Sequence, residues 1–155
     1  MKTSGKIISL KKAAALRAAL KRGGKKVVFT NGCFDIMHAG NVASLEKSRS
    51  LGDFLFLGLN SDSSVRRLKG PSRPFNKARD RAIVLAALAA VDALVIFNED
   101  TPIKLIKALR PDVLAKGADY TNGTVVGAEF AGRVVLIPLL KGRSTTALAR
   151  KLGRD

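Results

Sequence analysis

Short apolar runs alternate with amphipathic stretches along the whole chain. Five of these runs, at residues 27–29, 54–60, 93–97, 113–115 and 134–137, predict strands. Each run is almost continuously apolar and is flanked by polar residues, Gly or Pro. Strands that are buried on both faces of a parallel sheet have this composition, whereas half-exposed strands alternate apolar and polar residues.

The stretches between these runs have the spacing of helices. A first helix is predicted at 7–21, with Ser4 before it and a Gly-Gly pair at 23–24 that ends it. Pro102 is expected at the first position of a helix at 102–109 that Asp100 or Thr101 caps. Further helices are predicted at 42–50, from 76 or 77 to 90, and at 147–152, with a helical turn at 63–68 and an irregular basic loop at 69–74.

This alternation predicts an α/β fold, a Rossmann-like doubly wound parallel sheet of about five strands with right-handed crossovers. The chain of 155 residues has the length of one domain, and no linker or internal repeat divides it. Residues 1–155 are therefore expected to form a single domain, to which residues 1–24 contribute an N-terminal helix.

Composition points to a cytoplasmic protein without a membrane partner. No apolar run reaches the roughly 18 residues that cross a bilayer, and the polar residues at 1–12 do not resemble a signal peptide. Cys33 is the single cysteine, so an intrachain disulfide is excluded and a reducing compartment fits.

Charge is the unusual property of the composition: 28 Lys and Arg residues stand against 12 Asp and Glu residues, a net charge of +16. A basic surface can bind nucleic acid by displacing counterions from phosphates. Here the cations lie in short groups throughout the chain, with one tyrosine and no tryptophan among them. We therefore expect solvated faces and a phosphate-handling cleft instead of a specific nucleic-acid site.

The most informative stretch, 27–41, reads Val-Val-Phe-Thr-Asn-Gly-Cys-Phe-Asp-Ile-Met-His-Ala-Gly-Asn. A predicted strand passes through a glycine-containing polar turn into a predicted helix. The turn carries Asp35, His38 and Asn41, and His38 is the only histidine of the chain. A strand, a polar turn and a helix N-terminus together predict a phosphate-binding site at the carboxyl edge of the sheet.

Other polar groups follow the remaining strands and are expected at the same edge. Two arginines, 79 and 81, lie where the helix dipole disfavours cations and indicate an anion nearby. Each group also has a purely structural interpretation: a stiff loop at 69–74, a surface ion pair of Asp80 with Arg81, a solvated Lys116, an ordinary helix cap at 144–146 and a packed Cys33.

The motifs taken together resemble a known family. Asn-Gly-Cys-Phe-Asp-x-x-His-x-Gly at 31–40 resembles the first motif of the cytidylyltransferase-like nucleotidyltransferases, which usually ends in His-x-Gly-His. Nearly the whole chain resembles the adenylyltransferase domain of bacterial heptose 1-phosphate adenylyltransferases. The segments that carry this second resemblance are Asn60-Ser61-Asp62, Lys69-Gly70-x-x-Arg73-Pro74, Asp80-Arg81, Lys116-Gly117-x-Asp119-Tyr120, Val126-Gly127 and Arg143-Ser144-Thr145-Thr146.

The resemblance implies transfer of AMP from ATP to heptose 1-phosphate, with release of pyrophosphate, for lipopolysaccharide precursors. It implies a homodimer and Mg²⁺ bridging the nucleotide phosphates, with no metal site built from protein ligands alone. The implied catalytic residues are His38, Asn41 and Lys69. The implied nucleotide-binding residues are Thr30, Asn31, Gly32, Cys33, Phe34, His38, Gly40, Asn41, Lys116, Gly117, Asp119, Ser144, Thr145 and Thr146, and the substrate-binding residues are Asp35, Asn60, Asp62, Lys69, Arg73 and Arg81.

The chain departs from the family pattern in three ways. Asn41 stands where the family has its second histidine, and an amide cannot become cationic as an imidazole can. The segment between Val126 and Val134 is shorter than usual, and the sugar kinase domain that many relatives carry is expected to be missing. Two alternatives stay open: cytidylyl transfer to a polyol phosphate such as glycerol 3-phosphate, and a catalytically silent nucleotide-binding protein.

Overall fold

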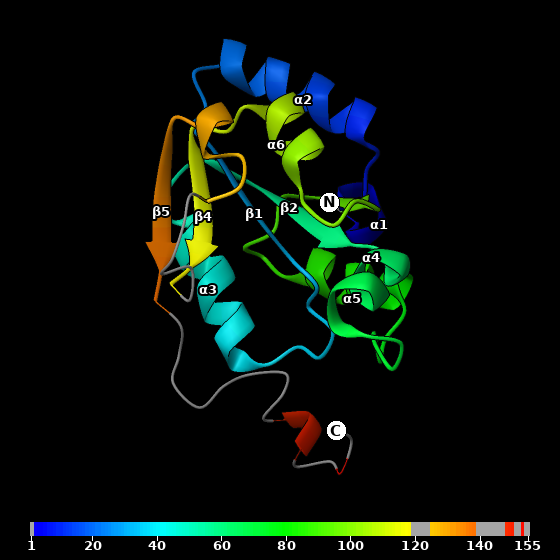
Figure 1. The fold of residues 1–155 in the computed structure, drawn as a ribbon. Coiled ribbons are helices and arrows are strands. Elements are labelled where there is room, and N and C mark those ends of the chain that lie inside the picture. The colour runs from blue at the N-terminus through cyan, green and yellow to red at the C-terminus, as the bar shows by residue number, and fades with distance from the viewer. Residues whose placement is uncertain (1, 119–124, 139–147, 151–152, 154–155) are drawn as a thin grey trace.

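A five-stranded parallel sheet forms the centre of the computed structural model, which describes residues 2–118, 125–138, 148–150 and 153 (Figure 1). The strand order is β3-β2-β1-β4-β5, so the chain runs outward from β1 to β3 and then returns to the other side of β1. All neighbouring strands are parallel, and the predicted α/β sheet is confirmed. The strands are β1 Val27–Gly32, β2 Phe54–Asn60, β3 Ala93–Phe97, β4 Val113–Gly117 and β5 Arg133–Ile137.

Helices cover both faces of the sheet, as a doubly wound fold requires (Figure 1). Helices α2 and α6 pack on one face, and α3 and α5 pack on the other. The helices are α1 Thr3–Lys6, α2 Leu10–Arg22, α3 Ala39–Arg49, α4 Asp62–Lys69, α5 Ala78–Ala87 and α6 Ile103–Leu109, with a 3₁₀ helix at Ala128–Phe130.

The continuous apolar runs are explained by these two layers. In β1, Val27 and Phe29 belong to the core under α2 and α6, whereas Val28 belongs to the core under α3 and α5. All three side chains are fully buried. Successive residues of a strand point to opposite faces, so a strand covered on both faces needs apolar residues at every position.

The N-terminal helix begins later than the sequence pattern predicts. Helix α2 starts at Leu10, where the Ser9 hydroxyl accepts a hydrogen bond from the Lys12 backbone N–H at 3.3 Å. Ile7 instead forms a bridge with Leu94 of the edge strand β3, and the Ile8 N–H donates to the Leu94 carbonyl at 2.9 Å. The predicted start was wrong because these β-branched residues cover an open sheet edge instead of extending a helix.

Several other boundaries differ from the predictions. Pro102 is the N-cap of α6, and no side chain caps that helix, so the predicted cap by Asp100 or Thr101 was wrong. Helix α3 begins three residues earlier than predicted, at Ala39, and α5 ends at Ala87 instead of residue 90. The turn predicted at 63–68 is the eight-residue helix α4. Of the helix predicted at 147–152, residues 148–150 are described and are helical.

Within the described residues, no helix combines the length and the apolar character that crossing a bilayer requires.

Gly58 in β2 provides a test of how tightly the sheet packs against α6. A Cβ atom at this position would lie 2.9 Å from Phe29 Cζ and 3.2 Å from Leu105 Cδ2. We predict that Gly58→Ala lowers the free energy of unfolding by about 1–3 kcal/mol, because buried neighbours must move. Urea denaturation measures this, with Gly23→Ala as the control, since a Cβ there meets only ordinary contacts at 3.6 Å. Equal stability of the two variants would contradict the packing argument.

Candidate active site

A cleft of about 410 Å³ opens at the carboxyl edge of the sheet. It lies at the point where the strand order reverses, between β1 and β4. These two strands pair only at Val28 with Val113 and at Phe29 with Leu114, so their carboxyl ends extend beyond the paired region. Crevices at such reversal points are where open α/β sheets bind ligands.

Many of the residues singled out from the sequence meet in this cleft. They come from the ends of β1, β2 and β4 and from the last turn of α4, segments far apart in the chain. Their common position confirms the expectation that the polar strand ends share one edge of the sheet. The sequence-predicted residues that line the cleft are Asn31, Gly32, Cys33, Asn60, Lys69, Lys116 and Gly117.

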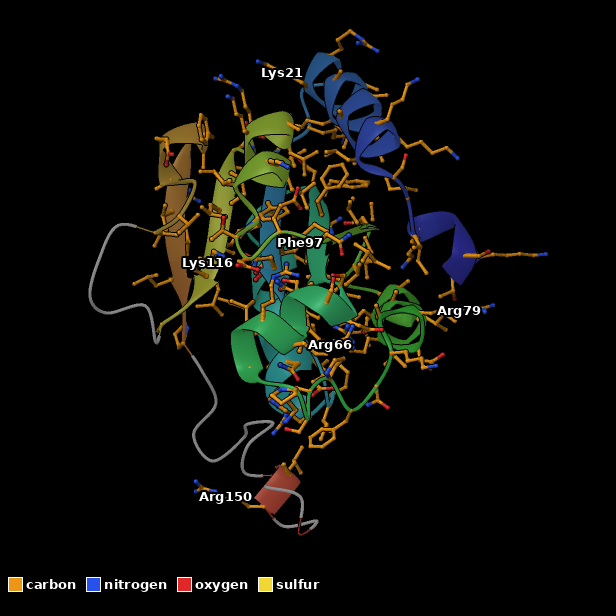
Figure 2. All side chains as sticks on the ribbon, turned by 45° about the vertical axis from the view of Figure 1, so that its right-hand side comes forward. Lys21, Arg66, Arg79, Phe97, Lys116 and Arg150 are labelled. Atoms are coloured by element: carbon orange, nitrogen blue, oxygen red, sulfur yellow. The ribbon has the colours of Figure 1, made fainter. Side chains whose placement is uncertain are left out.

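Lys116 is a buried cation at the reversal point, with 5% of its surface exposed (Figure 2). Its Nζ atom donates a hydrogen bond to the Asn31 side-chain oxygen on β1. This hydrogen bond fixes the ammonium group of Lys116 beside the cleft. Lys69 adds a second cation to the lining, and together they suit a polyanionic ligand.

The turn after β1 is locally strained. Phe34 adopts a left-handed backbone conformation, with φ of 46°. Its ring lies so close to Gly32 that a Cβ atom there would be 2.8 Å from Phe34 Cε2. A side chain at Gly32 would therefore require the Phe34 ring to move. A strained backbone such as that of Phe34 is typical of functional turns.

His38 and Asn41 form the start of α3. His38 is the N-cap residue, and its backbone N–H donates to the Asn41 side-chain oxygen at 3.2 Å. The amide oxygen of Asn41 therefore caps the helix, which leaves its NH₂ group as the part that can donate to a ligand. Because α3 follows β1, its positive N-terminal end lies at the carboxyl edge of the sheet.

Asp35 is a fully buried carboxylate that holds the basic loop. Its Oδ1 accepts hydrogen bonds from the backbone N–H groups of Phe75 at 2.7 Å and Asn76 at 3.1 Å. Its Oδ2 lies 3.3 Å from Nη1 of Arg73, whose guanidinium also stacks 4.1 Å from the centre of the Phe75 ring. Asp35 thus orients the loop, and Arg73 is already engaged by protein partners.

Arg81 is also buried, with 3% of its surface exposed. Its guanidinium donates to the carbonyl oxygens of Asn76 at 2.9 Å, Cys33 at 2.5 Å and Asn60 at 3.0 Å. Nη2 of Arg81 pairs with Oδ1 of Asp62 at 2.8 Å. One side chain therefore joins the turn after β1, the end of β2, the start of α4 and the loop before α5.

These positions change the interpretation of the predicted substrate-binding residues. The placement of Arg81, and of Asp62 beside it, favours a structural role over the substrate contact that the resemblance implies. The alternative interpretation of Asp80 and Arg81 as a surface ion pair was wrong, because Arg81 points inward and pairs with Asp62. Lys69 and Asn60, in contrast, do line the cleft.

The cleft also contains residues that the sequence reasoning did not select as ligand-binding: Leu68, Asp100, Thr101, Pro102 and Val126. The segment 100–102 follows β3 and so ends at the same edge as the other polar strand ends. The rule that the carboxyl ends of parallel strands share one edge identifies this segment as part of the site. Its local pattern, however, is also typical of a helix cap.

Burial raises the pKa of the Cys33 thiol above its usual value, and the positive charges of Lys69 and Arg81 oppose this shift. A thiol with a raised pKa stays protonated at neutral pH and is a poor nucleophile. Cys33 therefore contributes shape to the cleft, not covalent chemistry.

Four of the predicted nucleotide-binding residues follow β4 or β5 in the chain. Asp119, Ser144, Thr145 and Thr146 lie outside the described residues, so their assignments stay predictions. Within the part that is described, no three His, Cys, Asp or Glu side chains gather where they could hold a metal ion.

A model of the cytidylyltransferase-like family matches residues 29–142, which span the strands and the cleft described above. The chain belongs to this family. The resemblance that the motifs indicated is thus confirmed at the level of the family, together with its nucleotidyltransferase character.

Curated relatives are similar over nearly the whole chain. The bifunctional protein HldE of Mesorhizobium japonicum is 60% identical over 150 residues, which cover 94% of this chain and 30% of that protein. The bifunctional protein HldE of Helicobacter pylori strain J99 is 52% identical over 152 residues, covering 98% of this chain and 32% of that protein. The chain therefore spans about a third of the length of these relatives.

Solved structures agree with the fold. The lipopolysaccharide core biosynthesis protein from Thermoplasma volcanium is 26% identical with a TM-score of 0.62, covering 77% of this chain and all of that one. The pantoate-beta-alanine ligase from Francisella tularensis has a TM-score of 0.60 at 16% identity, covering 96% of this chain and 79% of that one. At that identity the second likeness shows the fold alone.

The structural role of Arg81 can be tested against a neighbouring arginine. We predict that Arg81→Met lowers the free energy of unfolding by about 3–5 kcal/mol, because Asp62 and three carbonyl groups lose a buried partner. Arg79→Met is the control, since Arg79 is exposed on the same helix (Figure 2) and the change removes the same charge. Denaturant titrations of both variants measure the free energy of unfolding. If Arg81→Met lowers it no more than Arg79→Met does, the structural role of Arg81 is rejected.

Proposed function

We propose that this chain transfers the AMP group of ATP to heptose 1-phosphate and releases pyrophosphate, giving ADP-heptose for lipopolysaccharide synthesis. The observation that carries the proposal is the cleft at the reversal point, where the buried Lys116 and the neighbouring Lys69 face one cavity. Further support comes from the motif series and from the relatives named HldE at 50–60% identity.

The proposed chemistry needs no protein nucleophile. A phosphate oxygen of the sugar phosphate attacks the α-phosphorus of ATP in line and forms a new P–O bond. The bond from the α-phosphorus to the α–β bridging oxygen breaks, and pyrophosphate leaves with that electron pair. Catalysis of this kind consists of positioning and of stabilising the negative charge on the phosphates.

The residues at the carboxyl edge have the groups that this reaction requires. Lys116 and Lys69 supply positive charge beside the cleft. The N-terminus of α3 supplies backbone N–H groups, and His38 and the Asn41 amide are proposed to donate to phosphate oxygens there. Asp35 and Arg81 hold the loops that carry these groups, as their buried contacts indicate.

The donor set also bears on Mg²⁺. Lysine ammonium and amide N–H groups favour phosphate, and the described residues include no group of three metal-ligating side chains. We propose that Mg²⁺ enters with the triphosphate and is held by its oxygens, where it would neutralise phosphate charge.

The proposal is tested with purified protein, ATP, Mg²⁺ and heptose 1-phosphate, by measuring pyrophosphate release and ADP-heptose formation. CTP with glycerol 3-phosphate is the parallel reaction for the cytidylyltransferase alternative, and thermal shifts with ATP and CTP report which nucleotide binds. Product from the ATP pair alone supports the proposal. Product from the CTP pair, or none from either, rejects it.

Asn41 is the residue on which the rate is expected to depend most. We predict that Asn41→His raises kcat by about tenfold or more, because one preorganised donor is worth on the order of 10²–10³ in rate. Asn41→Ala serves as the matched variant, since it removes both the donor and the bond to the His38 N–H. If the unchanged protein has a rate near zero and Asn41→His does not raise it, the silent nucleotide-binding alternative is favoured.

A further inference from the structure

We infer that the turn between β3 and α6 is a hydroxyl-binding subsite, in which Asp100 and Thr101 accept hydrogen bonds from the ring hydroxyls of a bound carbohydrate. The inference rests on the proposed function, because it names the part of the substrate that one wall of the cleft contacts. Both residues line the cleft, and β2 and β1 separate their turn from Lys116 at the end of β4.

Helix α4 holds this turn in place through side chains on one face. The Ser63 hydroxyl donates to the Asn98 side-chain oxygen at 3.1 Å. Nε of Arg67 donates to Oδ1 of Asp100 at 2.7 Å, and Nη2 of Arg67 donates to the Asn98 carbonyl. Figure 1 shows α4 directly after the end of β2, beside the carboxyl edge of the sheet. The carboxylate of Asp100 therefore has a defined position at the cleft.

Two hydrogen bonds of the buried Ser64 hydroxyl connect the same turn to Asn60 in the cleft. The Ser64 hydroxyl, which is fully buried, donates to the Glu99 carbonyl at 2.8 Å. It also accepts a hydrogen bond from Nδ2 of Asn60 at 2.9 Å, and Asn60 itself lines the cleft. Side chains that are preorganised by their neighbours lose little entropy when a ligand binds.

The charge of Asp100 indicates what it contacts. Among the described residues that line the cleft, Asp100 is the only carboxylate, while Lys69 and Lys116 are cations. Oδ1 of Asp100 pairs with Nε of Arg67 at 2.7 Å, which offsets part of its charge, so the carboxylate disfavours a phosphate mainly because it offers no hydrogen-bond donor. A carboxylate accepts hydrogen bonds only, and a hydroxyl group is the uncharged donor of a sugar phosphate.

The neighbouring apolar groups complete a surface suited to a sugar ring. Leu68, with 50% of its surface exposed, and Pro102 also line the cleft. A carbohydrate ring presents C–H groups as well as hydroxyls, and it can cover such apolar surface while its hydroxyls reach acceptors. The part of the cleft formed by the β3–α6 turn and Leu68 therefore fits the carbohydrate part of a substrate, and the end of β4 with Lys116 fits its phosphates.

Two carbohydrates could supply these hydroxyls: the sugar of the sugar phosphate and the ribose of the nucleotide. The test therefore compares Asp100→Asn with the full chain by calorimetry, using heptose 1-phosphate, ATP, 2′-deoxy-ATP, 3′-deoxy-ATP and inorganic pyrophosphate as separate ligands. Glu99→Gln is the matched control, because Glu99 is the adjacent carboxylate, pairs with Lys104 at 2.9 Å and does not line the cleft.

We predict that Asp100→Asn weakens carbohydrate binding about tenfold, as expected for loss of a hydrogen bond to a charged group. Pyrophosphate binding is expected to stay equal or to tighten slightly, because a negative charge is removed. Weaker binding of heptose 1-phosphate assigns the subsite to the acceptor sugar. Weaker binding of ATP, with loss of the preference over a deoxy-ATP, assigns it to the ribose.

Thr101→Val provides a second, independent variant, because it keeps the shape of the side chain and removes its hydroxyl. The inference is overturned if Asp100→Asn leaves every carbohydrate affinity unchanged, or if Glu99→Gln has the same effect. It is also overturned if Asp100→Asn tightens all phosphate ligands alike, which would show a purely electrostatic role. These binding constants are measured without turnover, so an absence of AMP transfer would reject the proposed function while the subsite is still tested.

Discussion

The buried guanidinium of Arg81 is the interaction on which the architecture of the site depends. It donates to three carbonyl groups, from the turn after β1, the end of β2 and the loop before α5, and it pairs with Asp62 at the start of α4. Carbonyl groups at strand ends have no ladder partner, and burial without one is costly. A planar group with several donors satisfies them together, so segments distant in sequence meet at one edge of the sheet.

Asp35 fixes the backbone of the same loop before α5. Its buried carboxylate accepts from two backbone N–H groups and lies beside Arg73. The two buried charges are each matched by several polar partners, which is the condition under which burial of charge is tolerated. Lys116 is a third buried charge, and its ammonium group donates to the Asn31 side-chain oxygen at the cleft.

The basic residues have two different roles, which explains part of the high net charge. Some basic residues, such as Arg81, are used inside the fold, while Lys69 and Lys116 surround the cleft. Lys69 ends α4, and the same helix holds the turn that carries Asp100, with β2 and β1 between this turn and Lys116 on β4. A cleft with the buried cation Lys116 at one end and a carboxylate beside apolar groups at the other matches a ligand with phosphates at one end and hydroxyls at the other.

The sequence by itself determined the sheet, because continuous apolar runs are stable only when both faces of a strand are covered. It also identified the turn at 31–41 and the polar ends of β2 and β4, since the topology brings all carboxyl strand ends to one edge. Only the tertiary structure decided which polar residues face the cleft. Asp35 and Arg81 look like ligand-binding groups in sequence, yet each contacts backbone groups and one oppositely charged side chain that folding brings to it. Asp100 looks like a helix cap, yet contacts from α4 hold it at the cleft, and such long-range contacts leave no local pattern.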